Sequence, residues 1–132
     1  MTRVLALAVA LAALAACAPR PEEPILNDFF SASRLRDRTA LQKIATATFD
    51  PAARGIITGF NITGVVTSLA GGRETKDVAI SAPVKLPSGE IRQQQLVVTL
   101  ERDESGSIAG VAGRWIVTAI RDAVGGPSSP PR

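Results

Sequence analysis

The side chains of this sequence that could carry acid–base chemistry are almost all carboxylates, because the chain has no histidine and no tyrosine. General acid–base catalysis near neutral pH uses histidine most often, or a carboxylate whose pKa is tuned by burial and by neighbouring charges. The aspartates that could fill this role are Asp28, Asp37, Asp50, Asp77 and Asp122. A catalytic site in this chain would therefore depend on one of these carboxylates.

Asp28 differs from the other aspartates because the aromatic pair Phe29 and Phe30 follows it directly. A carboxylate beside two large apolar side chains could stand at the mouth of a cavity, and these three residues form the predicted cavity. The alternative is a solvated position on a helix, since aspartate is mostly exposed in folded proteins. We favour the solvated position, so the sequence predicts a protein that is not an enzyme.

Other site chemistries lack their residue types. A metal site needs clustered cysteine, histidine or carboxylate ligands, and the chain has no histidine and a single cysteine. A serine nucleophile would have no histidine base. The Gly71–Gly72 pair has no lysine and serine or threonine partner of the phosphate-binding type. We therefore expect no metal and no cofactor.

The single cysteine, Cys17, ends an N-terminal segment with the layout of a secretory signal peptide. Arg3 supplies positive charge, residues 4–16 are thirteen consecutive apolar residues, and small alanines precede the cysteine. Thirteen residues of helix cover about 20 Å, which is short of the roughly 30 Å hydrocarbon core of a bilayer. The pattern predicts a cleaved signal peptide over residues 1–16 rather than a permanent membrane span.

The four residues Leu14-Ala15-Ala16-Cys17 resemble the lipobox of bacterial lipoproteins. This resemblance implies cleavage between Ala16 and Cys17 and attachment of fatty acyl chains, such as palmitate, to the cysteine. Two or more acyl chains anchor a protein stably, whereas one does not. Ala18 follows the cysteine, which in such lipoproteins favours the outer membrane over the inner one. The alternatives are an ordinary signal peptide with an unmodified cysteine, or a buried helix.

The predicted mature chain would be nearly balanced in charge. Residues 1–16 hold one of the 15 basic residues and none of the 12 acidic ones, so 116 residues with a net charge of +2 would remain. The basic residues Arg34, Arg36 and Arg38 are close to Asp28 and Asp37 in the sequence, and no aromatic residue lies between them. The sequence therefore gives no support for a nucleic-acid partner.

Composition divides the mature chain into three parts. Residues 17–24 are rich in proline and charge, which is typical of a short tether between lipid and domain. Residues 124–132 consist largely of glycine, serine and proline, so we expect a disordered tail. The folded domain is expected over residues 25–123.

Residues 25–49 have helical spacing of their apolar side chains. The spacing predicts two short helices that meet near residues 36–38, with Asp37 or Thr39 as the cap of the second. The second helix should end at Asp50-Pro51, because the residue before a proline avoids helical geometry.

After Pro51 the apolar spacing changes to alternation, which predicts strands over residues 56–68, 74–86, 91–102 and 114–122. Short turns at residues 70–73 and 87–90 favour antiparallel neighbours. The prediction is an α+β domain in which N-terminal helices cover a four-stranded antiparallel meander. Pro83 should place its strand at an edge or at a bulge, and Gly59 and Gly64 should mark bends or bulges.

This arrangement resembles the NTF2-like, or cystatin-like, superfamily. The residues that carry the resemblance are the helical opening over 27–51, the long hairpin over 76–102 and the last strand, "GRWIVTAI", over 113–120. The resemblance implies a curved sheet that forms a cone with the helices. Enzymes of the superfamily place Asp, Tyr or His in that cone, and only the first of these types is present here.

One face of the last two strands should carry apolar side chains that no helix covers. Strict alternation puts Val97, Trp115, Val117 and Ala119 on this face, which we expect to be an interaction surface or a homodimer interface. Together the patterns predict a lipid-anchored protein on the periplasmic side of the cell envelope that binds an envelope protein or a small apolar ligand. The alternatives are an enzyme that uses a carboxylate in the cone, and a structural subunit of an envelope complex.

Overall fold

The computed structural model describes residues 20–123. The predicted signal peptide over residues 1–16, the predicted cleavage and acylation site at Ala16 and Cys17, and the predicted tail over 124–132 lie outside the described residues.

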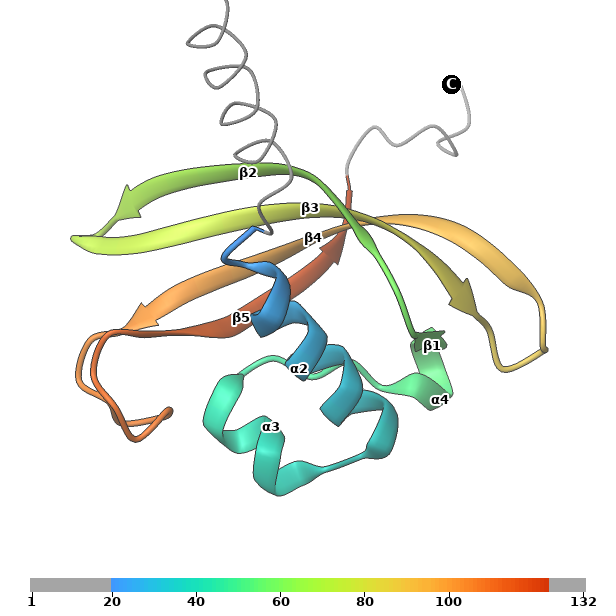
Figure 1. Cartoon of the computed structure of the whole chain (residues 1–132), viewed down its shortest axis with the longest axis horizontal. Helices are drawn as coiled ribbons and strands as arrows, with labels where there is room; N and C mark the ends of the chain where they lie inside the picture. The colour runs from blue at the N-terminus through green and yellow to red at the C-terminus, as the bar shows by residue number, and fades with distance from the viewer. Residues whose placement is uncertain (1–19, 124–132) are drawn as a thin grey trace, which may run out of the picture.

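The described chain is an α+β domain, as predicted, with its helices before its strands. Helices α2 (Glu23–Leu35), α3 (Arg38–Ile44) and α4 (Pro51–Arg54) precede strands β1 (Ile56–Ile57), β2 (Asn61–Ala70), β3 (Arg73–Lys85), β4 (Ile91–Asp103) and β5 (Arg114–Asp122). All strand pairs are antiparallel, in the order β1-β3-β4-β5 with β2 also paired to β3. Figure 1 shows the sheet curling over α2 and α3, which lie on its concave side.

The predicted first strand is divided into two, and the division explains the position of Pro83. β2 pairs with β3 as far as Ser81, whereas the two residues of β1 pair with Val84 and Lys85. Pro83 therefore falls between the two pairings. β3 is a central strand and not an edge strand. Neither β1 nor β2 pairs with β3 at Pro83, so the missing N–H of the proline costs no hydrogen bond of the ladder on that side of the strand. The bulge expected at Gly64 is confirmed by a register shift between Ile62 and Gly64.

The folded domain begins earlier than predicted. Helix α2 starts at Glu23, and the preceding residue Glu22 is buried, so residues 22–24 belong to the fold and not to a tether. Leu26, Phe29 and Phe30 form the apolar stripe of the helix and point into the core. Since positions three and four apart share a helix face, this spacing attaches the helix to the sheet along one side.

Helix α3 is shorter than predicted because the chain after it pairs with the sheet. Its cap is as expected, with Asp37 Oδ1 accepting from the N–H of Ala40 at 3.0 Å. The helix ends at Ile44 and not near residue 49, where its end was predicted. Two residues later, the N–H of Thr46 donates to the carbonyl oxygen of Val117 at 2.9 Å. The edge of β5 offers free backbone groups, so an extended path satisfies this segment better than further helix does.

The expectation that Asp50-Pro51 ends a helix was also wrong, because these residues begin one. The side chain of Asp50 accepts from the N–H of Ala52 at 3.0 Å, and Pro51 occupies the first turn of α4. Proline suits that position because its missing N–H is not needed there.

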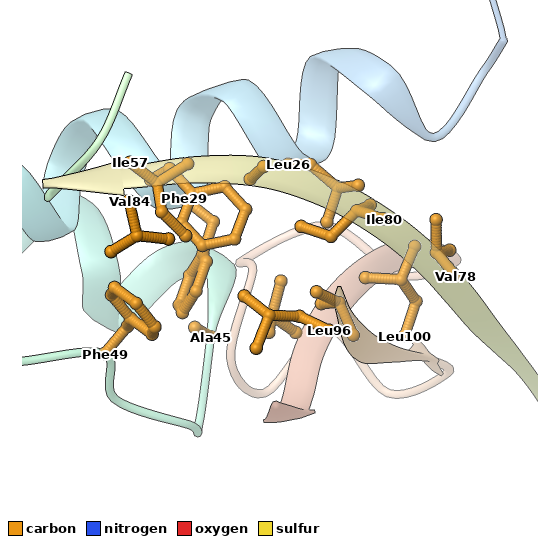
Figure 2. Close-up of a cluster of buried hydrophobic side chains, with 14 residues drawn as sticks. Leu26, Phe29, Ala45, Phe49, Ile57, Val78, Ile80, Val84, Leu96 and Leu100 are labelled. Atoms are coloured by element: carbon orange, nitrogen blue, oxygen red, sulfur yellow. The ribbon is translucent and has the colours of Figure 1, made fainter. Parts of the chain in front are cut away.

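The core lies between the helices and the concave face of the sheet. The largest fully buried side chains are Phe29, Leu26, Ile80, Leu96, Leu100, Val78, Val84, Val98 and Val117. Figure 2 shows how side chains of α2 and of strands β3 and β4 meet in this layer. Phe30 packs edge-on against Phe29 and Phe49, with ring centroids 5.3 Å and 5.6 Å apart. These rings extend the core to the segment before α4.

We expect Phe29→Ala to lower the free energy of unfolding by about 3–5 kcal/mol, because it removes a fully buried ring and leaves a cavity. Urea unfolding followed by circular dichroism measures the change. Asn27→Ala, at an exposed position on the same helix, is the control and should change the free energy by less than about 0.5 kcal/mol. Equal losses for the two variants would contradict the position of α2.

Candidate functional site

A groove of about 400 Å³ lies where the first turns of α2, the end of α3 and the start of β5 come together. We call it the Trp115 groove. Its lining combines apolar side chains with charges of both signs and consists of Pro24, Ile25, Asp28, Lys43, Ile44, Gly113, Arg114 and Trp115. The volume is in the range of small-molecule sites, and its apolar wall with a few charged groups is typical of a binding site.

Two cations lie close to the ring of Trp115. The Nζ atom of Lys76 lies 4.7 Å from the centre of the indole ring, and the guanidinium carbon of Arg102 lies 5.7 Å from it. Both distances are within the range of cation–π attraction. The ring is half-buried, so it packs against the core and also lines the groove.

Two ion pairs hold these cations. Lys76 Nζ donates to Glu22 Oε1 at 3.0 Å, with side chains only 19% and 7% exposed, respectively. Arg102 Nη1 lies 3.3 Å from Glu74 Oε2 in a more exposed pair. The first pair joins the residue before α2 to β3, so it fixes the start of the helix relative to the sheet and shapes one end of the groove.

The environment of Glu22 favours its ionised form. Burial by itself would raise the pKa of the carboxyl group, but the hydrogen bond from Lys76, a backbone hydrogen bond and the charges of Lys76 and Arg20 outweigh it. The pKa of Glu22 is therefore below its ordinary value, and the carboxylate is charged at neutral pH.

The sequence contains a signal for this ion pair. Lys76 falls in the same alternating row as the core residues Val78 and Ile80, so its side chain must lie on the covered face of the sheet. A lysine on a covered face needs a partner. The identity of that partner, 54 positions away along the chain, depends on how α2 packs and could not be read from spacing.

The four residues of the predicted interaction surface do not lie on one face of the sheet, so this prediction is wrong. Val117 is fully buried and Trp115 packs against the core, so both face the helices. Val97 and Ala119 lie on the opposite, convex face, where Ala119 is paired with Thr99. A register shift in the pairing of β4 with β5 at Thr99 causes the error, because it reverses the alternation between residues 117 and 119.

The predicted cavity residues are also separated. Phe29 and Phe30 are side chains of the packed core, 0% and 4% exposed. Asp28 is exposed and lines the Trp115 groove. Consecutive helical residues point about 100° apart, so a carboxylate next to a buried phenylalanine can stand at the rim of the covered layer.

The convex face of the sheet is covered by polar contacts. Ser81 Oγ accepts from the side-chain amides of Gln93 at 2.6 Å and Gln95 at 3.0 Å. Thr99 Oγ1 donates to Asp77 Oδ1 at 2.7 Å. Such a network is expected of a sheet face in contact with water. Val97 and Ala119 lie among these polar groups, so they do not form a continuous apolar patch on this face.

Asp103, at the C-terminal end of β4, is a buried carboxylate that hydrogen-bonds to the loop after the strand. Asp103 Oδ2 accepts from the N–H groups of Ile108 and Ala109 at 2.9 and 2.8 Å. These backbone hydrogen bonds, that from Ala109 above all, hold the pKa of Asp103 below its ordinary value. The carboxylate orders the loop between β4 and β5, and that use of the residue was not anticipated from the sequence.

Two further observations concern the described chain. No group of three residues of metal-ligating type lies together within residues 20–123. In the same range, no helix is long and apolar enough to cross a membrane.

Comparisons of the chain with protein-family models, with curated proteins and with solved structures find no match.

We expect Glu22→Gln to lower the free energy of unfolding by about 1–3 kcal/mol at neutral pH, because it leaves the largely buried Lys76 without its ionic partner. The folded-state pKa of Glu22 is lowered, so the ion pair stabilises the fold above the ordinary glutamate pKa, and this contribution is lost as the pH falls through the folded-state value. Urea unfolding at about pH 7 and about pH 3 measures both effects.

The control for this variant is Glu23→Gln, which removes the neighbouring exposed carboxylate. It should leave the free energy of unfolding nearly unchanged at both pH values. A deficit of Glu22→Gln that grows in acid, instead of shrinking, would contradict the assignment.

Proposed function

We propose that this chain is an exported, lipid-anchored envelope protein whose domain is a non-catalytic binding module held at the membrane surface. The observation that supports this most is the short distance along the chain between Cys17 and Glu22. Glu22 is buried and ion-paired to the sheet, and it comes only five positions after the proposed acylation site. Five residues span at most about 18 Å, so an acyl anchor on Cys17 would hold the domain against the lipid headgroups.

The Trp115 groove is the binding site that this arrangement favours. Pro24 and Ile25, which line it, follow Glu22 directly, so the groove is within the same short reach of the proposed anchor. Trp115 gives the groove a large, fixed aromatic surface of the kind that dominates many interfaces. The ligand that fits this lining is an apolar segment of an envelope protein or a small apolar molecule, bordered by Lys43 and Asp28.

The geometry supports the enzyme alternative less well. Asp28 is exposed and lines an open groove, and a solvated carboxylate lacks the burial that tunes a general acid or base. A structural subunit of an envelope complex would use the same groove and the same anchor, so it differs from a binding module only in the permanence of its partner.

We also propose that the domain is a reduced member of the NTF2-like superfamily. The curled antiparallel sheet with helices on its concave side supports this relationship. In this chain the space between helices and sheet is filled by apolar side chains, among them Phe29, Phe30 and Phe49. A cone packed in this way suits a binding role at its rim better than a reaction inside it.

The anchor is tested by Cys17→Ser. We expect the variant to lose incorporation of labelled palmitate and to leave the membrane fraction, because the acylated thiol is removed. The control is Ala18→Ser, which keeps the cysteine and should retain both properties. A Cys17→Ser chain that is still labelled and still found in membranes would rule out the anchor.

The groove is tested by a photo-reactive amino acid at Lys43, combined with mass spectrometry of the cross-linked product from intact envelopes. We expect one recurrent product from position 43, and none from the exposed position Arg34, which does not line the Trp115 groove. Ile25→Glu in the chain that carries the probe should reduce the yield several-fold, because a charge replaces part of the apolar wall. Equal products from positions 43 and 34 would contradict binding in the groove.

A further inference from the structure

A second groove, also of about 400 Å³, lies at the opposite end of α2 from the Trp115 groove. We call it the Ser33 groove. The last turn of α2, helix α3 and the segment that enters α4 form its walls. It is distinct from the first groove because the two share no lining residue.

The Ser33 groove contains a buried hydroxyl group without a hydrogen-bond partner. Ser33 is 3% exposed, and its Oγ atom is buried and makes no hydrogen bond within the described chain. Buried polar atoms in folded proteins are nearly always paired, since an unpaired one has lost its water without replacement. The closure of this atom extends to the groove itself, so a ligand bound there does not reach the Oγ atom of Ser33.

The positive charge of the groove comes from two arginines. Arg36 and Arg38 line the groove, both are exposed, and neither takes part in an ion pair among residues 20–123. The Asp37 carboxylate between them is occupied by the cap of α3, where it accepts from Ala40. Guanidinium groups bind carboxylate and phosphate oxygens through paired N–H donors, so this pair favours an anion.

The backbone at Arg36 is an independent indication that its side chain is used. Its φ is +55°, in the left-handed region, where it ends α2 by donating its N–H to the carbonyl oxygen of Ser33. Glycine is the usual residue at this point of a helix end because a side chain there is strained. An arginine at this position costs stability, and an anion bound by its guanidinium would offset that cost.

The rest of the lining limits the charge and polarity of the ligand. Asp50 also lines the groove, so its carboxylate leaves a net lining charge of +1 and disfavours multiply charged anions. Leu41, Phe49 and Pro51 supply an apolar wall beside the arginines. A ligand with one negative charge and an apolar tail satisfies both parts.

We propose that the Ser33 groove binds a monoanionic amphiphile. Its carboxylate or phosphodiester group is held by Arg36 and Arg38, and its apolar tail lies along Leu41 and Pro51. This site does not depend on the Trp115 groove or on the membrane anchor.

Equilibrium dialysis of the full chain, in nanodiscs of zwitterionic phosphatidylcholine, tests the proposal against empty nanodiscs. The probes are hexanoate, hexyl methyl phosphate, dimethyl phosphate and hexylamine. We expect saturable binding of hexanoate or hexyl methyl phosphate, and the tighter of these two monoanions identifies a carboxylate or a phosphodiester as the headgroup. Hexylamine should not compete, and dimethyl phosphate should bind at least about tenfold more weakly because it lacks the apolar tail. Equal binding of hexylamine would overturn the proposal.

Substitutions identify the site. The double variant Arg36→Gln with Arg38→Gln should weaken binding by about tenfold or more. The matched control is Arg34→Gln, at an exposed position of α2 that does not line the groove, and it should bind as the unmodified chain does. Equal affinities for the double variant and the control would overturn the proposal.

Thermal unfolding separates ligand binding from a structural role. Without ligand, Arg36→Gly should melt at or above the temperature of the unmodified chain, because it relieves a strained backbone. Weaker binding together with unreduced stability is the expected result. A marked loss of stability in Arg36→Gly, compared with the unmodified chain, would mean that the arginine side chain serves the fold, and it would overturn the role assigned to it.

Discussion

The position of α2 against the concave face of the sheet is the constraint on which the rest of the molecule depends. Leu26 and Phe29 are fully buried in that contact, and Phe30 extends it edge-on to Phe49. Close-packed side chains allow little sliding or rotation of the helix. The contact therefore fixes both ends of α2 at once, so that the first turns border the Trp115 groove and the last turn borders the Ser33 groove.

The ion pair of Lys76 with Glu22 extends this constraint to the point where the chain enters the fold. A lysine on the covered face of a sheet is unfavourable unless its charge is matched, and Glu22 matches it at 3.0 Å. The same ammonium group lies over the Trp115 ring, so one cation serves both a carboxylate and an aromatic face. The start of α2, the sheet and the groove are thus held by a single cluster, close along the chain to the proposed anchor at Cys17.

Local signals predicted much of the fold, and errors arose where the pairing of segments that are distant in the sequence decides the structure. Three predictions were confirmed: the positions of the long strands, Asp37 as a helix cap, and a bend or bulge at Gly64. Each rests on the alternation of apolar side chains along a strand or on interactions within a few residues of the chain. The face of Ala119 was wrong because a register shift depends on how β5 pairs with β4. Of the candidate site residues, Asp28 is exposed, as we favoured from the sequence, and it also lines a groove, whereas Val117 is buried in the core. The burial of Ser33 had a signal in the sequence, since it continues the apolar stripe of α2 four positions after Phe29.

The relation between the two grooves follows from how rigidly α2 is held. Coupling between two sites requires an element with two arrangements that both ligands bias. A shift of α2 would have to displace Leu26 and Phe29 from a fully packed core, and the burial of each such side chain is worth about 1.5–3 kcal/mol. It would also have to break the pair between Glu22 and Lys76. These combined costs exceed the 1–3 kcal/mol that is typical of allosteric coupling, so α2 acts as a fixed wall shared by two independent sites and not as a lever between them.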